Sequence, residues 1–262
     1  MVTGKIWLKV PETIKVIFEG KPQQGVFAKD LILYLAGQLT IDGATYQTIE
    51  FHGSTLAHLS LSSRMTMANM GIEIGAKAAI FSPEGLELPY EWIPTFADQE
   101  AVYSKIITID VSKIEPQIAH PHSPDNVKNL QTALGRPITY AFIGTCVNGR
   151  LEDLHVAAAI MKDKKLAKGV RMLIAPASQK VFVDALKDGT VQTLIESGAS
   201  FITSGCGPCV GSHLGVPGDG EVVISSANRN FKGRMGNPNA EVYLGSPATV
   251  AASAIAGFIT QA

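Results

Sequence analysis

The fold class is decided by the stretch Ile138-Thr-Tyr-Ala-Phe-Ile-Gly-Thr-Cys-Val-Asn-Gly149 and by the helical pattern that follows it. Residues 138–143 are an apolar run rich in β-branched and aromatic side chains, which predicts a buried strand. Residues 144–149 form a glycine-bounded loop, and the apolar positions between 151 and 161 recur at helical spacing. A buried strand, a short loop and a helix in this order are the repeating unit of an α/β fold.

The same alternation continues to the end of the chain. It predicts a mainly parallel sheet flanked by helices, because parallel strands are usually buried on both faces. The further strands are expected at 170–175, 199–203, 221–225 and 241–244, and the further helices at 178–186, 191–196 and 247–260.

The first part of the chain has the same α/β character. Its strands are expected at 6–10, 14–18, 48–51 and 78–81. Its helices are expected at 28–37 and at 60–75, with Ser60 or Ser62 as the N-cap of the second and Gly75 as its stop.

Three prolines between residues 116 and 126 separate the two parts. Proline at that density does not suit a helix or a central strand, so residues 116–134 are interpreted as a linker. Residues 1–115 and 135–262 would then be two α/β domains. His120 and His122 in the linker suggest a metal site, but we favour the interpretation that they are exposed linker residues.

The composition is that of a globular protein. The 262 residues are 46% hydrophobic and 17% charged, with a formal net charge of −1. A nucleic-acid-binding protein would show a basic excess, and a membrane span needs roughly 20 apolar residues in a row, so neither class is expected. The start of the chain lacks the apolar core of a signal peptide, which predicts the cytoplasm, where thiols stay reduced.

Three cysteines, an odd number for a disulfide framework, carry the chemistry that the sequence suggests. Cys146 follows the strand at 138–143, whereas Cys206 and Cys209 lie just after the strand at 199–203. Because the carboxyl ends of parallel strands meet at one edge of a sheet, the three thiols are expected to meet there. The surrounding glycines allow the backbone to approach a bulky group closely.

Several interpretations of the three thiols are open at this point. Zinc would need a fourth ligand, which His213 could supply. A [4Fe–4S] cluster held by three cysteines would leave one iron with a free coordination position, able to act as a Lewis acid. Cys206 and Cys209 could instead form a redox pair, or all three residues could be buried free cysteines.

A basic loop follows the strand at 221–225. It contains Arg229, Lys232 and Arg234 together with amide side chains that include Asn228. Arginine binds carboxylates through paired hydrogen bonds, so two arginines suit a dicarboxylic acid. Its position at the same sheet edge as the cysteines indicates a binding loop rather than a solvated surface loop.

Asn69 and Glu73 are candidate site residues in the first part of the chain. They lie four positions apart on the expected helix at 60–75, which puts them on one face. A carboxylate among mostly apolar neighbours needs a partner or a function.

Together these residues resemble the aconitase superfamily, and in particular its branch of 3-isopropylmalate dehydratase and homoaconitase large subunits. The likeness runs nearly end to end. Its motifs are Gly4-Lys-Ile-Trp-Leu-Lys-Val-Pro-Glu12, Ile49-Glu-Phe-His-Gly53, Arg64-Met-Thr-Met-Ala-Asn-Met70, Gly144-Thr-Cys-Val-Asn148 with Glu152-Asp-Leu154, Cys206-Gly-Pro-Cys-Val-Gly211 and Asn228-Arg-Asn-Phe-Lys-Gly-Arg-Met-Gly236.

The resemblance implies two aconitase-like α/β domains and a hydro-lyase reaction. Water would leave a 2-hydroxy di- or tricarboxylic acid and return on the neighbouring carbon, with isopropylmalate of leucine biosynthesis as the leading substrate. The implied site consists of a [4Fe–4S] cluster on Cys146, Cys206 and Cys209, of Asn69 and Glu73 near the open iron and the departing hydroxyl, of Asn228 near the cluster, and of Arg229 and Arg234 on the substrate carboxylates.

The sequence departs from the family pattern in two places. Large subunits of the family carry a further N-terminal domain that supplies histidine and aspartate to the site, and this chain begins where their second domain would begin. Val147 stands where the family often has threonine. The family's catalytic base is a serine of a swivelling domain, often a separate small subunit, so a partner protein is implied. Two other hypotheses are a zinc or thiol-redox protein and a truncated interaction module.

Overall fold

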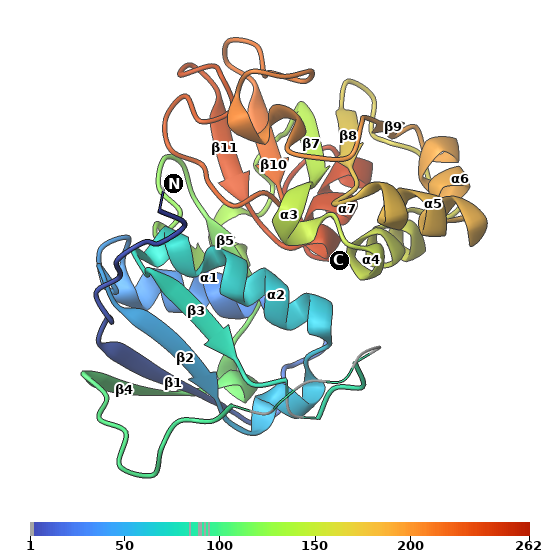
Figure 1. Cartoon of the computed structure of the whole chain (residues 1–262). Helices are drawn as coiled ribbons and strands as arrows, with labels where there is room; N and C mark the ends of the chain where they lie inside the picture. Colours follow the sequence, from blue (N-terminus) through green and yellow to red (C-terminus); the bar gives the residue numbers. More distant parts are fainter. Residues whose placement is uncertain (1–2, 84, 89–90, 92, 94) are drawn as a thin grey trace.

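The computed structural model describes residues 3–83, 85–88, 91, 93 and 95–262. It contains two mainly parallel sheets, one in each half of the chain, with helices packed against them (Figure 1). The expected α/β class, with mainly parallel sheets and flanking helices, is therefore confirmed.

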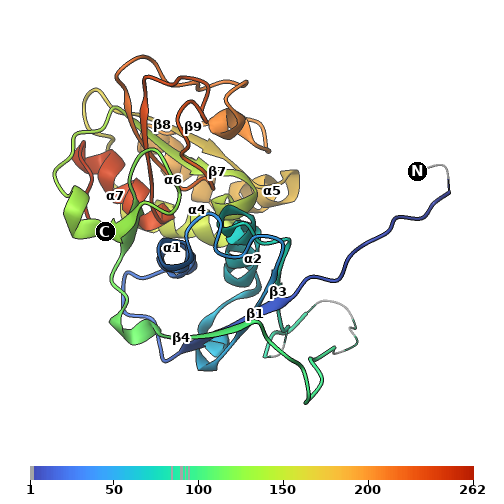
Figure 2. The ribbon, with the colours of Figure 1, turned by 90° about the vertical axis from the view of Figure 1, so that its left-hand side faces the viewer.

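The first sheet has the strand order β3-β2-β1-β4, and its neighbouring strands are parallel. Burial alternates along β1, so one face of the sheet is covered. The helices α1 and α2 cover that face and lie between the first sheet and the second half of the molecule (Figures 1 and 2). The elements are β1 (Thr13–Glu19), α1 (Ala28–Leu39), β2 (Thr48–His52), α2 (Leu61–Met70) continued by a 3₁₀ turn (Gly71–Ile74), β3 (Ala78–Phe81) and β4 (Lys105–Asp110).

One prediction for the first sheet was wrong, and one of its strands was not predicted. Residues 6–10 form no strand: the segment extends away from both sheets, with Trp7 84% exposed (Figure 2). An apolar segment becomes a strand only where a neighbouring strand accepts its backbone hydrogen bonds. The strand β4, which the sequence analysis did not predict, instead pairs with β1 along its full length.

The expected linker contributes two short strands to the second sheet. These are β5 (Gln117–Ala119) and β6 (Val127–Asn129), which pair antiparallel with each other, and β5 also pairs with β11. The prolines at 116, 121 and 124 flank these strands rather than interrupt them, so each keeps its backbone donors. The domain boundaries at 115 and 134 remain predictions.

The second sheet has the order β6-β5-β11-β10-β7-β8-β9, and its last five strands are parallel. These strands and their helices are β7 (Tyr140–Gly144), α3 (Thr145–Asn148), α4 (Leu151–Met161), β8 (Arg171–Ala175), α5 (Gln179–Lys187), α6 (Thr190–Glu196), β9 (Ser200–Phe201), β10 (Val222–Ser225), β11 (Glu241–Leu244) and α7 (Pro247–Ala256). They follow the expected pattern with two differences: α3 lies where a loop was expected, and β9 is shorter than the strand expected at 199–203.

One apolar core joins the two halves of the molecule. Buried residues of β1, α1 and α2 pack in the same cluster as Tyr140, Phe142 and Val147 of the second half. A second cluster lies between the second sheet and the helices α4 and α7. Because the first core crosses between the halves, side chains from both can be held at fixed positions around one site.

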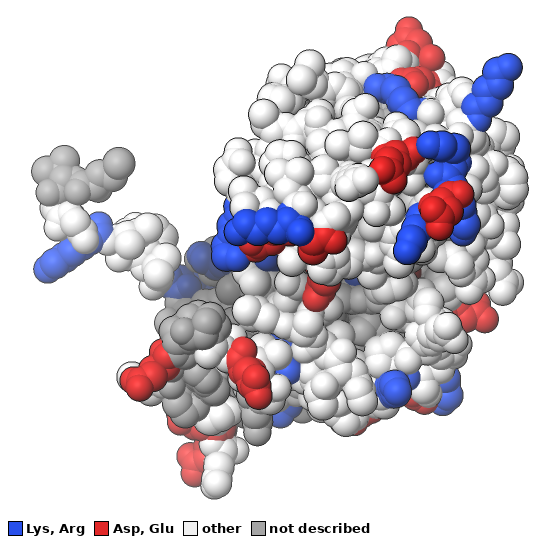
Figure 3. Space-filling view, turned by 90° about the vertical axis from the view of Figure 1, so that its right-hand side faces the viewer, with Lys and Arg blue, Asp and Glu red and all other residues white. Residues whose placement is uncertain are grey.

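A membrane protein would show a long apolar helix, and a nucleic-acid-binding protein would show a basic face. Within the described residues, no helix is long and apolar enough to cross a membrane. On the face seen in Figure 3, Lys and Arg side chains are interspersed with Asp and Glu rather than gathered into one field.

Candidate active site

The sheet order brings the candidate loops to one edge. The strands β10, β7, β8 and β9 are neighbours and parallel, so their carboxyl ends point the same way. Cys146 lies in α3 directly after β7, and Asn228 follows β10. Cys206 and Cys209 follow β9, with Cys209 in a 3₁₀ turn (Gly207–Val210). The loops of the three strands therefore share this edge, as expected for a ligand site in an open parallel sheet.

Cys146 contacts two of the predicted site residues. Its Sγ lies 3.8 Å from Oδ1 of Asn69 and 3.9 Å from Oδ1 of Asn228. The Asn228 Nδ2 also donates a hydrogen bond to Asn69 Oδ1. Asn69 is on α2 of the first half, so the two halves meet at Cys146.

The other two cysteines differ in their surroundings. Cys206 is exposed, as is Cys146, whereas Cys209 is buried. Burial raises the pKa of the Cys209 thiol, while the Arg234 guanidinium and the Asn228 backbone amide, both hydrogen-bonded to it, act in the opposite direction. Two exposed thiols do not match the interpretation of three buried free cysteines.

A single-ion metal site is not found among the described residues. Ligands of one zinc ion lie at about 2.0–2.3 Å from it and therefore close to one another. In the described part of the chain, no group of three or more His, Cys, Asp or Glu side chains could hold a single metal ion in this way. A four-iron cluster is not a single-ion site of this kind, because its thiolates bind different irons.

The loop of Cys206 and Cys209 lies against the basic loop at two glycines. A Cβ atom at Gly211 would lie 2.5 Å from the Gly236 amide nitrogen, and one at Gly236 would lie 2.5 Å from the Gly211 carbonyl oxygen. Both residues also have positive φ, which disfavours other residues. Glycine at both positions is what lets the two loops touch.

Glu73 and Arg229 form a partly buried ion pair between the two halves. The Glu73 Oε1 and the Arg229 Nε are 2.7 Å apart, and Glu73 is 5% exposed. Burial raises the pKa of Glu73, opposed first by Arg229 and then by Lys29 and Arg234. The structure thus brings both predicted arginines into electrostatic contact with Glu73.

Two residues that the sequence did not mark as site residues anchor the loops of this edge. Thr66 on α2 donates from Oγ1 to the Val147 carbonyl oxygen at 2.7 Å, which joins α2 to the Cys146 turn. Lys29 on α1 donates from Nζ to the carbonyl oxygens of Ser226 and Ala227. The sequence gives one indication that Lys29 is buried: it stands at the start of an apolar run that continues to residue 36. Val147 itself is fully buried, so its departure from the family pattern changes packing rather than an exposed contact.

Polar atoms on the cysteine loops and on the basic loop are buried without partners. Within the described part of the chain, Thr145 Oγ1, Ser204 Oγ and the Arg234 Nε have no hydrogen-bond partner. Buried polar groups are nearly always satisfied by protein, water or a bound group. A group bound at this edge would offer these atoms partners.

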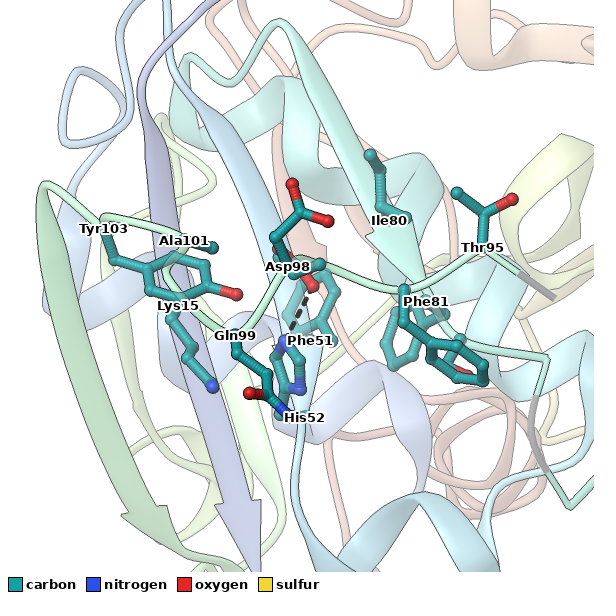
Figure 4. Close-up of a pocket in the computed structure, with 14 residues that line it drawn as sticks. Lys15, Phe51, His52, Ile80, Phe81, Thr95, Asp98, Gln99, Ala101 and Tyr103 are labelled. Carbon is teal, nitrogen blue, oxygen red and sulfur yellow. Dashed lines mark hydrogen bonds and ion pairs between the residues drawn. The ribbon is translucent and has the colours of Figure 1, made fainter.

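A separate hollow on the first sheet does not contain these residues. It measures about 330 Å³, and Lys15, His52, Ile80 and Tyr103 contribute to its lining (Figure 4). A hydrogen bond of 2.9 Å joins His52 Nε2 and Glu50 Oε1 in it. None of the candidate site residues lines this hollow, so we assign the candidate site to the edge of the second sheet.

Comparison with known proteins identifies the class. Residues 1–137 and 131–257 match the aconitase family (aconitate hydratase). The chain belongs to this family, which confirms the resemblance.

Within the family, the chain is similar to proteins named as large subunits. It is 47% identical to 3-isopropylmalate dehydratase large subunit 2 of Archaeoglobus fulgidus and 48% identical to large subunit 1 of Thermotoga maritima, in each case over 98% of this chain and 64% of the relative. It is 49% identical to a probable methanogen homoaconitase large subunit of Methanosarcina mazei, over 99% of this chain and 67% of the relative. The chain thus spans less than two thirds of the length of the first two relatives.

A solved structure shows a more distant likeness. Aconitase X of Thermococcus kodakaraensis, in its holo-form, aligns with a TM-score of 0.46 and 14% identity, over 84% of this chain and 49% of that chain.

Proposed function

We propose that this chain is the cysteine-bearing part of a hydro-lyase that isomerises a 2-hydroxy dicarboxylic acid. Water leaves the acid and returns on the neighbouring carbon. The observation that carries the proposal is the meeting of Cys146 with Asn69 and Asn228, from two halves of the chain, at a sheet edge that also holds two arginines. The relatives named 3-isopropylmalate dehydratase support isopropylmalate, an intermediate of leucine biosynthesis, as the substrate.

Cys146, Cys206 and Cys209 would hold a [4Fe–4S] cluster. Three thiols on glycine-rich loops, two of them exposed, suit a cluster with one open iron better than a closed four-ligand zinc site. The unpartnered polar atoms beside them fit the presence of a further group. When bound, the cluster supplies a Lewis acid that makes hydroxide a better leaving group. A cytoplasmic location, where thiols remain reduced, completes this proposal.

Arg229 and Arg234 would bind the two substrate carboxylates. Arg229 uses Nε for Glu73, which leaves the terminal amino groups of the guanidinium for a paired interaction with a carboxylate. Removal of a proton beside a carboxylate builds negative charge on that carboxylate. Fixed guanidinium groups stabilise this charge as it develops.

Glu73 and Asn69 would act on the hydroxyl that departs. Burial raises the pKa of Glu73, which favours a carboxyl group that can deliver a proton. Asn69 lies beside Cys146 and can orient the hydroxyl by hydrogen bonding. The base that removes the carbon-bound proton would come from a small-subunit partner, in keeping with relatives that are named large subunits.

The proposal is tested with an enzyme assembled from this chain, the part of a relative's large subunit that this chain does not cover, and a small subunit. The absorbance of the unsaturated acid formed from isopropylmalate reports the reaction. Arg229→Ala and Arg234→Ala are each expected to lower kcat/KM by about 100-fold or more. Arg136→Ala is the matched control, because Arg136 pairs with Glu241 on the surface. Unchanged kcat/KM in both site variants, or no turnover of any hydroxy dicarboxylic acid, contradicts the proposal.

A further inference from the structure

Lys29 is a buried cation that the proposed reaction does not use. Lys29 lies in the first turn of α1 and is 0% exposed. The Nζ donates to the Ser226 carbonyl oxygen at 2.9 Å and to the Ala227 carbonyl oxygen at 2.8 Å, across 197 and 198 residues of sequence. A buried ammonium is stable only where such acceptors replace water.

The acceptors of Lys29 lie directly before the candidate binding residues. Ser226 and Ala227 follow β10, and Asn228 and Arg229 are the next two residues. The backbone can rotate about only two dihedral angles per residue, because the peptide bond is planar. When two successive carbonyl groups are held, the directions open to the next residues are therefore few. The direction in which Asn228 and Arg229 leave the sheet is therefore tied to α1.

The charges around Lys29 support the same role. Burial lowers the pKa of Lys29 to about 8, and the carboxylates of Glu73, Asp153 and Asp30 and the thiol of Cys209 act in the opposite direction. Glu73, the first of these, is the ion-pair partner of Arg229. The Lys29 ammonium therefore interacts electrostatically with charged groups of the candidate site.

The first turn of α1 is itself fixed to the rest of the molecule. The neighbouring Asp30 accepts from the Gln117 amide through Oδ1 and from the Phe27 amide through Oδ2, both at 2.8 Å. The first bond joins the helix to β5 of the second sheet. A donor on a turn held in this way can position a loop, whereas a donor on a mobile side chain cannot.

We propose that Lys29 is a positioning residue, which holds the Ser226 and Ala227 carbonyls so that Asn228 and Arg229 point into the candidate site. The anchoring stands on the structure alone; its consequence for substrate binding rests on the proposed function. A methionine at position 29 fills a similar volume without the ammonium, so Lys29→Met removes the donor and keeps the packing.

The first test measures backbone hydrogen exchange in this chain. In Lys29→Met, amides 227–230 are expected to exchange at least ten times faster than in the wild type, while amides of α4 and β8 keep their rates. The control is Lys165→Met, because the exposed Lys165 also donates to a carbonyl oxygen, that of Glu196 at 2.5 Å. Exchange at 227–230 within twofold of the wild type, or equal acceleration throughout the chain, overturns the proposal.

A second variant covers the case in which Lys29→Met does not fold. Lys29→Arg keeps the positive charge but replaces the compact ammonium with a planar group of different reach. It is expected to fold and still to speed exchange at 227–230 by at least threefold; unchanged exchange there overturns the proposal.

A kinetic measurement separates this inference from the proposed function. In the assembled enzyme, Lys29→Arg is expected to raise KM for the hydroxy acid about tenfold and to change kcat less than threefold. Faster exchange with unchanged KM overturns the role in substrate binding. If even the wild-type enzyme turns over no hydroxy acid, the proposed function fails, whereas the exchange result still decides whether Lys29 holds the loop.

Discussion

Glu73 and Arg229 form an ion pair of 2.7 Å although 156 residues separate them in the sequence. Glu73 comes from the turn that continues α2, and Arg229 from the loop after β10. The pair joins a candidate proton donor to a candidate carboxylate ligand. Their relative position is therefore a property of the fold rather than of either loop alone.

The ion pair is expected to contribute to stability as well as to the site. In a double-mutant cycle with Glu73→Gln and Arg229→Gln, measured by urea unfolding, we expect a coupling free energy of about 1–2 kcal/mol. The Arg229 side chain is 34% exposed, which keeps the value below that of a fully buried pair. The control pair, Arg136 with Glu241, is exposed and should couple by less than about 1 kcal/mol. Equal coupling in the two pairs would argue against a special role for Glu73 and Arg229.

The hydrogen bond between Thr66 and the Cys146 turn is expected to stabilise the folded state. Thr66→Val leaves the buried Val147 carbonyl oxygen without its donor, which should lower the free energy of unfolding by about 1–3 kcal/mol. Thr132→Val removes a similar bond, from Oγ1 to the Asn129 carbonyl oxygen at 2.8 Å, at an exposed site where water replaces the donor. Thermal or urea unfolding compares the two. If Thr66→Val lowers the free energy of unfolding no more than Thr132→Val does, the hydrogen bond from Thr66 to Val147 does not stabilise the fold.

The contact between the two loops is expected to tolerate no side chain. Gly211→Ala would place Cβ 2.5 Å from the Gly236 nitrogen at a positive φ, so we expect destabilisation of about 2 kcal/mol or more. Gly218→Ala is the control, because its Cβ would make only ordinary contacts with Glu221. If urea unfolding gives the same stability for both variants, the loops do not touch as described.

Asp30 predicts a pH dependence of stability. Burial raises the pKa of Asp30 from 3.8 to about 7, against the Gln117 and Phe27 amides and Lys29, which lower it. Between these values the folded state binds more protons than the unfolded chain. The free energy of unfolding attributable to Asp30 therefore falls as the pH rises from about 4 to 7, by up to about 1.4 kcal/mol per pH unit, and levels off above that.

The test compares Asp30→Asn with the wild type in urea at several pH values. The difference between their unfolding free energies should change across this range, because asparagine does not titrate. Parallel curves for the two proteins would show that Asp30 has its ordinary pKa in the folded state.

The sequence predicted the second half of the fold more completely than the first. Strand–loop–helix units such as 138–161 carry their information locally, in apolar runs bounded by glycine. Whether residues 6–10 or residues 105–110 form the strand beside β1 depends on which segment reaches that strand. Pairing between distant segments has no local signal, and the same reason hid β5 and β6 within a proline-rich segment.

The candidate site was predictable in its residue types but not in its contacts. The cysteine loops follow buried strands, so their meeting at one edge follows from parallel topology. The Glu73–Arg229 pair and the Lys29 anchor depend on how α1 and α2 pack against the second half. A buried lysine on an apolar helix gives no indication in the sequence of which distant carbonyl oxygens it reaches.

The most direct test of the central claim is an iron, sulfide and zinc count on this chain after anaerobic reconstitution with iron and sulfide. The account predicts a brown protein with about four irons per chain, which Cys146→Ser, Cys206→Ser and Cys209→Ser each lose in large part. Conversion of His213 to alanine should leave the iron content unchanged, because no histidine is required. A colourless protein with about one zinc per chain would contradict the proposed cluster. An iron content that none of the three cysteine substitutions changes would contradict it as well.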